Sequence, residues 1–149
     1  MKIICDNRKA RHLYEILDTF ESGMVLTGSE VKSLRDGRAH LNDAYADFQG
    51  GELFLFQAHI APYAQASYNN HEPLRKRKLL LHKKELMKLV GQIQEKGLTL
   101  IPLQLYWKEG YAKIKLALSK GKKTFDKRES IKKRETDRTI ARVMRNKNR

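Results

Sequence analysis

Residues 98–118, LTLIPLQLYWKEGYAKIKLAL, decide the fold of this chain. Two apolar runs, 98–107 and 111–118, flank Lys108-Glu109-Gly110, and this arrangement predicts a β-hairpin. In the second run Lys113 and Lys115 alternate with Ile114 and Leu116, so one face of the strand is polar and the other is apolar. The hairpin therefore needs further strands to cover its apolar face.

Further strands are predicted upstream. Residues 41–59 alternate in two blocks around Gln49-Gly50-Gly51-Glu52, which indicates a second hairpin with a Gly-Gly turn. Residues 14–26 mix β-branched and aromatic residues around Glu21-Ser22-Gly23, and we interpret them as two strands and a turn.

Two helices separate these strands. Thr27-Gly28-Ser29-Glu30 matches a capping box and predicts a short helix that runs to about Asp36, with Gly37 as its stop. The longest helical stripe has apolar residues at i, i+3, i+4 and i+7 and ends at Gly97; its members are Leu86, Leu89, Val90 and Ile93.

Five or six antiparallel strands in one short chain must hide their edges, either by closing on themselves or by packing as two sheets. We therefore expect a mostly β fold, an OB-type antiparallel Greek-key barrel with short flanking helices. The barrel is expected to occupy residues 1–118. Residues 119–149 are expected to form a basic C-terminal tail that is disordered when free.

Charge is concentrated in that tail. The chain has 149 residues, a formal net charge of +14, and a tail with thirteen Lys or Arg against four acids. Too few apolar residues remain in the tail to offset its conformational entropy. Drawn as a helix, the tail places Arg134, Arg138, Arg142, Arg145 and Arg149 on one face, while Ile140, Val143 and Met144 gather on the opposite face. This pattern favours a helix that forms on a polyanion, and a merely solubilising tail is the alternative.

A second basic cluster precedes the long helix. Six cations and no acid lie within residues 74–84, and they include Arg75-Lys76-Arg77-Lys78. On a strand, the two arginines would face one side and the two lysines the other. The cluster is either a phosphate-contacting arm, with steeply salt-dependent binding, or a solvated loop.

Little in the sequence points to catalysis. The five histidines lack metal-ligand spacing, and Cys5 is the single cysteine. Lys120-Gly121-Lys122-Lys123-Thr124 only partly matches a phosphate-binding loop, because the upstream glycine is missing. No apolar run approaches the roughly 18 residues that a membrane span needs. We expect a cytoplasmic monomer that is not an enzyme and uses no metal or cofactor.

Seven motifs in order resemble the small protein B family, the SsrA-binding proteins, over nearly the whole chain. They are Asn7-Arg8-Lys9-Ala10, Phe20-Glu21-Ser22-Gly23, Gly28-Ser29-Glu30-Val31-Lys32-Ser33-Leu34-Arg35, Leu53-Phe54-Leu55-Phe56, His59-Ile60-Ala61-Pro62-Tyr63, Arg77-Lys78-Leu79-Leu80-Leu81-His82, and Lys120-Gly121-Lys122-Lys123 followed by Asp126-Lys127-Arg128. Ser29 and Ser22 depart from the commoner family residues.

The resemblance implies a barrel that binds the tRNA-like domain of transfer-messenger RNA, near its D-loop analogue and elbow. Asn7 and Glu21 match family positions tied to that RNA. A carboxylate there accepts hydrogen bonds from guanine or cytosine amino groups, or else it orients a nearby arginine. The expected RNA-binding residues are Asn7, Arg8, Lys9, Glu21, Arg75, Lys76, Arg77, Lys78, Lys120, Lys122 and Lys123.

The resemblance also implies that the tail engages the ribosome, becoming helical in the empty mRNA channel beyond the decoding site. The residues expected to act there are Asp126, Lys127, Arg128, Arg134, Arg138, Ile140, Arg142, Val143, Met144 and Arg145. Expected partners are transfer-messenger RNA, small-subunit rRNA, and elongation factor Tu through the shared RNA, with no membrane. The alternatives to this adaptor are a basic structural or assembly-associated ribosomal protein and, third, a nuclease or NTPase.

Overall fold

The computed structural model describes residues 2–64 and 70–121, and the predicted tail beyond residue 121 lies outside this range. Nine strands and three helices occur in the described part of the chain. In order they are β1 (Lys2–Asp6), α1 (Arg8–Leu13), β2 (Tyr14–Met24), α2 (Gly28–Arg35), β3 (Ala39–His40), β4 (Tyr45–Gln49), β5 (Glu52–Phe56), β6 (His59–Ile60), β7 (Arg77–Leu80), α3 (Lys83–Lys96), β8 (Thr99–Lys108) and β9 (Tyr111–Gly121).

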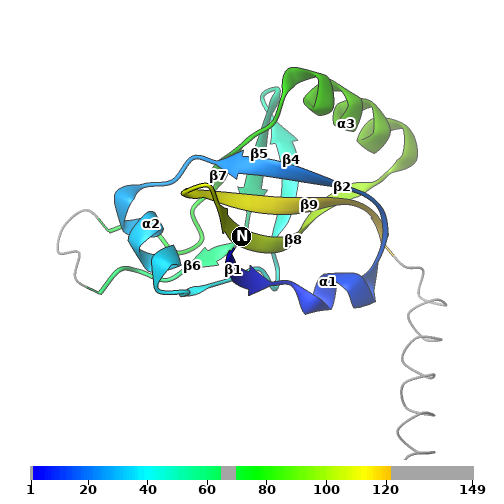
Figure 1. The fold of residues 1–149 in the computed structure, drawn as a ribbon. Coiled ribbons are helices and arrows are strands. Elements are labelled where there is room, and N and C mark those ends of the chain that lie inside the picture. The colour runs from blue at the N-terminus through cyan, green and yellow to red at the C-terminus, as the bar shows by residue number, and fades with distance from the viewer. Residues whose placement is uncertain (1, 65–69, 122–149) are drawn as a thin grey trace, which may run out of the picture.

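Six of the strands close into an antiparallel barrel. The main sheet has the order β1-β8-β4-β5-β7-β2-β9, and β8 also pairs with β9, which joins its two sides. Strand β1 adds to the outside edge of β8, and the short pair β3–β6 forms a separate two-stranded sheet. Figure 1 shows the long β2, β8 and β9 crossing the body of the molecule. The prediction of a mostly β, OB-type barrel is confirmed.

Both predicted hairpins are present. Strands β4 and β5 are joined by Gly50 and Gly51 at φ 62° and 80°, the left-handed values that a tight hairpin turn requires. Strands β8 and β9 pair as far as Lys108 and Tyr111, so that only Glu109 and Gly110 form their turn. Strand β9 runs three residues past the predicted barrel boundary and ends at Gly121 opposite Tyr14. Ser119, Lys120 and Gly121 are therefore part of the sheet.

The turn predicted at Glu21-Ser22-Gly23 is wrong, because residues 14–24 form one continuous strand. Glu21, Ser22 and Gly23 pair with Lys115, Ile114 and Lys113 of β9. A Cβ on Gly23 would lie 3.5 Å from the Leu80 side chain of β7, which is an ordinary van der Waals contact, so the space beside Leu80 does not require a glycine. The Ser22 hydroxyl is buried and donates to the Leu80 carbonyl at 3.1 Å.

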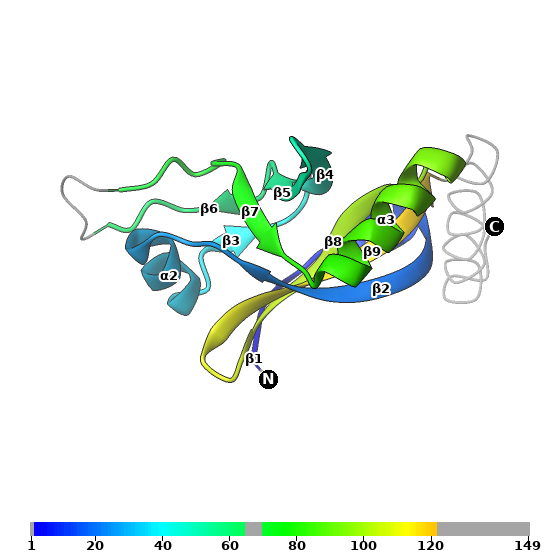
Figure 2. The same ribbon diagram turned by 90° about the horizontal axis from the view of Figure 1, so that it is seen from above.

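Each helix has a separate place around the barrel. Helix α3 ends at Gly97 in the left-handed conformation, as predicted, and buries Leu89 in the main core with Leu98 and Leu100. Helix α1 instead lies outside the barrel, where Ala10 packs on Ile101 and Leu103 of β8. Figure 2 shows α2 and α3 at opposite ends of the molecule. None of the helices in the described ranges is long and apolar enough to span a membrane.

The barrel core contains a buried ionic cluster beside α2. The predicted capping box is present: Thr27 N–H donates to Glu30 Oε1 at 2.8 Å, and the Thr27 hydroxyl accepts from Glu30 N–H. Glu30 and Arg77 are both 0 % exposed, and Arg77 Nε donates to Glu30 Oε2. Arg75 Nη2 donates to Glu30 Oε1 at 2.6 Å from the rim. Burial alone would raise the pKa of Glu30, but these hydrogen bonds outweigh it and lower that pKa to about 2.

Replacing Glu30 with glutamine should lower the free energy of unfolding by about 3–5 kcal/mol, because Arg77 keeps a buried charge without its counter-ion. The wild-type protein should hold its stability above about pH 4.5 and lose it as the pH falls toward 2, where Glu30 becomes protonated. The Glu30→Gln variant lacks this contribution at every pH. Urea unfolding between pH 2 and pH 6 measures both effects.

Glu52→Gln is the matched control, since Glu52 makes an exposed ion pair with Lys78 at 3.1 Å. Its loss should change stability by no more than about 1 kcal/mol. Equal stability losses for Glu30→Gln and Glu52→Gln would contradict this account of the core.

Candidate nucleic-acid interface

The outer face of β2, β9 and β8 carries a row of polar side chains. Glu21 of β2 lies opposite Lys115 of β9, which in turn lies opposite Gln104 of β8. Lys113 of β9 and Tyr106 of β8 form the next row. Helix α1 covers the far end of this face over Ala117, so the polar half remains open.

Glu21 is held in place by two partners on β8. The Tyr106 hydroxyl donates to Glu21 Oε2 at 2.6 Å, and Lys108 Nζ lies 3.3 Å from the same oxygen. The bond from Tyr106, followed by Lys108 and the nearby charge of Lys113, lowers the pKa of Glu21. Burial and the Glu21 charge raise the pKa of Tyr106. The carboxylate is thus ionised and fixed, while its side chain keeps 40 % exposure.

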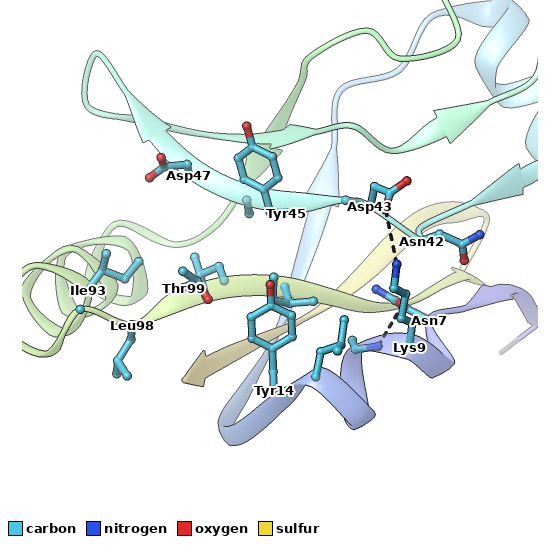
Figure 3. A pocket seen from close by; sticks show the side chains of 17 residues that line it. Asn7, Lys9, Tyr14, Asn42, Asp43, Tyr45, Asp47, Ile93, Leu98 and Thr99 are labelled. Atoms are coloured by element: carbon cyan, nitrogen blue, oxygen red, sulfur yellow. Dashed lines mark hydrogen bonds and ion pairs between the residues drawn. The ribbon is translucent and has the colours of Figure 1, made fainter. Parts of the chain in front are cut away.

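The motif at Asn7–Lys9 has two different roles. The Asn7 side chain is buried: its Oδ1 accepts from Ala10 N–H at 3.3 Å, and its Nδ2 donates to the Pro102 carbonyl at 2.8 Å. Asn7 therefore caps α1 and fixes the helix to β8. Arg8 and Lys9 are exposed on α1, and Lys9 Nζ lies 3.7 Å from Asp43 Oδ1, as Figure 3 shows.

A groove of about 640 Å³ separates α1 from β4. Figure 3 shows that Tyr14 points toward β8 from the α1 side of this groove, while Asp43 and Asn42 lie on the opposite side. Asn7 and Lys9 thus lie at the edge of a groove, while Glu21 lies in a separate hollow lined by residues of β2, β8 and β9.

The basic cluster at residues 75–78 corrects one expected RNA contact. The alternation of arginines and lysines is confirmed, but the arginine side faces the interior. Arg77 has no exposed surface and donates to Glu30 and to the Ala58 and Pro73 carbonyls, so it cannot reach a phosphate. Arg75 is partly exposed but also pairs with Glu30.

The two lysines of that cluster lie on the outside. Lys76 Nζ lies 4.4 Å from the centre of the Phe54 ring and donates to Gln49 at 2.6 Å. Lys78 pairs with Glu52. Both lysines remain candidates for phosphate contact, although each already has a partner on the barrel.

Lys120 is exposed at the end of β9 opposite Glu15. Lys122, Lys123 and the ten expected ribosome-binding residues of the tail lie outside the described residues.

The sequence reasoning missed Tyr106, Lys108 and Gln104 as parts of the site. The alternating pattern did place Lys113 and Lys115 outward, and their exposure follows that pattern. No local signal connects Tyr106 with Glu21, because 85 positions separate them. Only the closure of the barrel brings the two side chains together.

The described residues offer little for catalysis. Within them no three His, Cys, Asp or Glu side chains are grouped so that they could hold a metal ion. Burial raises the pKa of the half-buried Cys5 thiol to about 11, so the thiol stays protonated and unreactive near neutral pH.

The fold and this surface define a small basic β-barrel protein with an open, charged outer face. The family model described as SmpB protein matches residues 4–146. An SsrA-binding protein of Desulforudis audaxviator is 58 % identical over 98 % of this chain and 95 % of its own length. One of Enterococcus faecalis is 54 % identical over 97 % of this chain and 94 % of its own length.

A solved structure also matches. This structure is described as "tmRNA-SmpB: a journey to the center of the bacterial ribosome". The match has a TM-score of 0.69 and 52 % sequence identity, and it covers 85 % of this chain and 93 % of that chain. The chain belongs to the SmpB family, the SsrA-binding proteins.

Replacing Tyr106 with phenylalanine should raise the pKa of Glu21, because the carboxylate loses its strongest hydrogen bond. Lys108→Met should raise the same pKa by less, since its Nζ is 3.3 Å away and exposed. Titration of the Glu21 carboxyl carbon by NMR measures both. A pKa that does not respond to Tyr106→Phe would contradict the proposed control of Glu21.

Proposed function

We propose that this protein is a non-enzymatic RNA-binding adaptor of the cytoplasm. It binds the tRNA-like domain of transfer-messenger RNA and carries it to stalled ribosomes for trans-translation. Two observations support the proposal. SsrA-binding relatives match this chain over nearly their full length, and the description of a similar solved structure names tmRNA, SmpB and the bacterial ribosome. Elongation factor Tu joins the same assembly through the shared RNA.

One observation carries the proposal: a fixed, ionised carboxylate lies among cations on the open outer face. Glu21 has Lys108 at 3.3 Å and Lys115 directly across the sheet. Lysines attract phosphates whatever the base sequence, whereas a carboxylate repels them and accepts hydrogen bonds from base amino groups. Such a mixed face is suited to one particular RNA surface rather than to polyanions in general.

The barrel and the tail divide the work in this proposal. The barrel supplies specific RNA binding through Glu21, Arg8, Lys9 and the end of β9. The tail, residues 122–149, has a net charge of +8 by its sequence and engages small-subunit rRNA in the vacant mRNA channel. The arginine face would meet phosphates, and Ile140, Val143 and Met144 would find apolar cover.

The full chain should bind the isolated tRNA-like domain much more tightly than generic rRNA fragments at physiological salt. Deletion of residues 122–149 should leave much of this affinity and reduce the slope of log K against log salt, because fewer counterions are released. Fluorescence anisotropy over a range of salt concentrations measures both. Equal affinity for rRNA fragments would favour a structural ribosomal protein instead.

The same deletion should abolish peptide tagging on stalled ribosomes while the barrel still holds the RNA. Within the tail, Ile140→Asp should reduce tagging more than Ile140→Leu, because only the aspartate removes apolar character from the face opposite the arginines. A reconstituted tagging assay on ribosomes with truncated mRNA provides the measurement. Equal tagging by the two variants would show that the apolar face has no role.

A further inference from the structure

The groove between α1 and β4 is large and mostly apolar. Its volume of about 640 Å³ falls within the roughly 300–1,000 Å³ of ordinary ligand pockets. Figure 3 shows Tyr14 on the α1 side of the groove and Tyr45 on the β4 side. Apolar residues of α1, α3 and β8 complete the lining, among them Leu13, Ile93 and Ile101. Such a groove is suited to the apolar side chains of another segment.

The charged groups at this groove are unusual for so basic a chain. Asp43 and Asp47 line it together with Lys9, whereas the whole chain has a net charge of +14. Asp43 is 78 % exposed and lies 3.7 Å from Lys9 Nζ. Asp47 accepts from Phe48 N–H at 2.8 Å, and among the described residues it has no ion-pair partner. Two carboxylates repel a phosphate backbone, so the groove favours a cationic segment that also carries apolar side chains.

The tail of the same chain begins beside this groove. Strand β9 ends at Gly121, which pairs with Tyr14, and Tyr14 lines the groove. The next ten residues, 122–131, have the sequence KKTFDKRESI, with four cations, two acids and the only aromatic residue of the tail, Phe125. Four residues span at most about 14 Å, so Phe125 can reach the Tyr14 side of the groove from Gly121.

We propose that residues 122–131 dock in this groove of their own molecule, with Phe125 on the apolar lining and the flanking cations facing Asp43 and Asp47. The inference goes beyond the RNA-binding function and does not depend on it, because it concerns the free protein. It replaces the expectation of disorder for residues 122–131 alone, and residues 132–149 stay free. Docking holds the first cations of the tail against the barrel and away from indiscriminate contact with phosphates.

The short connection makes even weak docking effective. A segment tethered by a few residues has an effective concentration at its site in the millimolar range. A segment that would bind as a free peptide with a Kd of about 1 mM would therefore occupy the groove roughly half of the time. Burial of one aromatic ring and the approach of opposite charges are together sufficient for an affinity of this order.

Nuclear magnetic resonance of the full chain in the absence of RNA tests the docking directly. The Phe125 ring protons should show NOEs to the methyl groups of Leu13 and Thr99, which both line the groove. Backbone order parameters of residues 122–131 should exceed those of residues 132–149, because values below about 0.6 are typical of a flexible segment.

Two pairs of variants connect these signals with the groove. Phe125→Ala should remove the order of residues 122–131 and shift the amide signals of the groove, whereas Phe125→Leu should keep part of both. Asp47→Lys should lower the docking equilibrium constant by about two- to fivefold, the range expected for an exposed ion pair. Asp18→Lys is the matched control and should have no effect. Asp18 is exposed on β2 outside the groove, and it too accepts from the N–H of the next residue at 2.8 Å.

Three results would overturn the proposal. One is equal mobility of residues 122–131 and 132–149, and another is order that survives Phe125→Ala in a variant whose circular dichroism shows a folded barrel. The third is NOEs that weaken on dilution, which would assign the docked segment to a second copy of the chain. Since these measurements contain no RNA, failure of the RNA-binding assay would refute the proposed function alone.

Discussion

The buried ion pair of Glu30 and Arg77 connects segments of this molecule that lie far apart in the sequence. The Glu30 carboxylate accepts from Thr27 N–H at the start of α2, from Arg77 at the start of β7, and from Arg75 just before that strand. Arg77 in turn donates to the Ala58 and Pro73 carbonyls, so one guanidinium holds the segments on both sides of β6. A buried charge without its partner costs several kcal/mol, and therefore α2, β6 and β7 must take their places together.

The position of β7 determines the rest of the barrel. Strand β7 lies between β5 and β2, and β2 continues past it to pair with nine residues of β9. This requires β2 to be long, and the Ser22 hydroxyl holds it against β7 by donating to the Leu80 carbonyl at 3.1 Å. The outward side chain just before Ser22 is Glu21. The outer face of β2 and β9 thus depends on the ionic cluster in the core, although no residue of that cluster lies on the face.

Most of the local structure was predictable, because it follows from local rules. The capping box at Thr27, the Gly-Gly turn, the stop at Gly97 and the alternation around Lys113 and Lys115 all depend on neighbours within a few positions. The errors concern long-range partners. Glu21-Ser22-Gly23 has the composition of a turn, but its pairing with β9 overrides that signal. The sequence predicts Arg77 as a phosphate contact, and this is wrong because the partner that buries it, Glu30, lies 47 positions away.

The role of the acidic residue Glu21 on the outer face is best understood from the positive charge of the whole chain. A net charge of +14 attracts any phosphate backbone strongly. More lysines on this face would therefore raise the affinity for every RNA without raising the specificity for one sequence. Selecting one RNA sequence over another requires a hydrogen-bond acceptor, because base amino groups can donate to it and phosphates cannot. A free glutamate on such a basic surface would pair with whichever lysine came nearest. Glu21 does pair with Lys108 at 3.3 Å, but the hydrogen bond from the buried Tyr106 fixes one of its oxygens, so the barrel as well as the surrounding charges sets the orientation of the carboxylate.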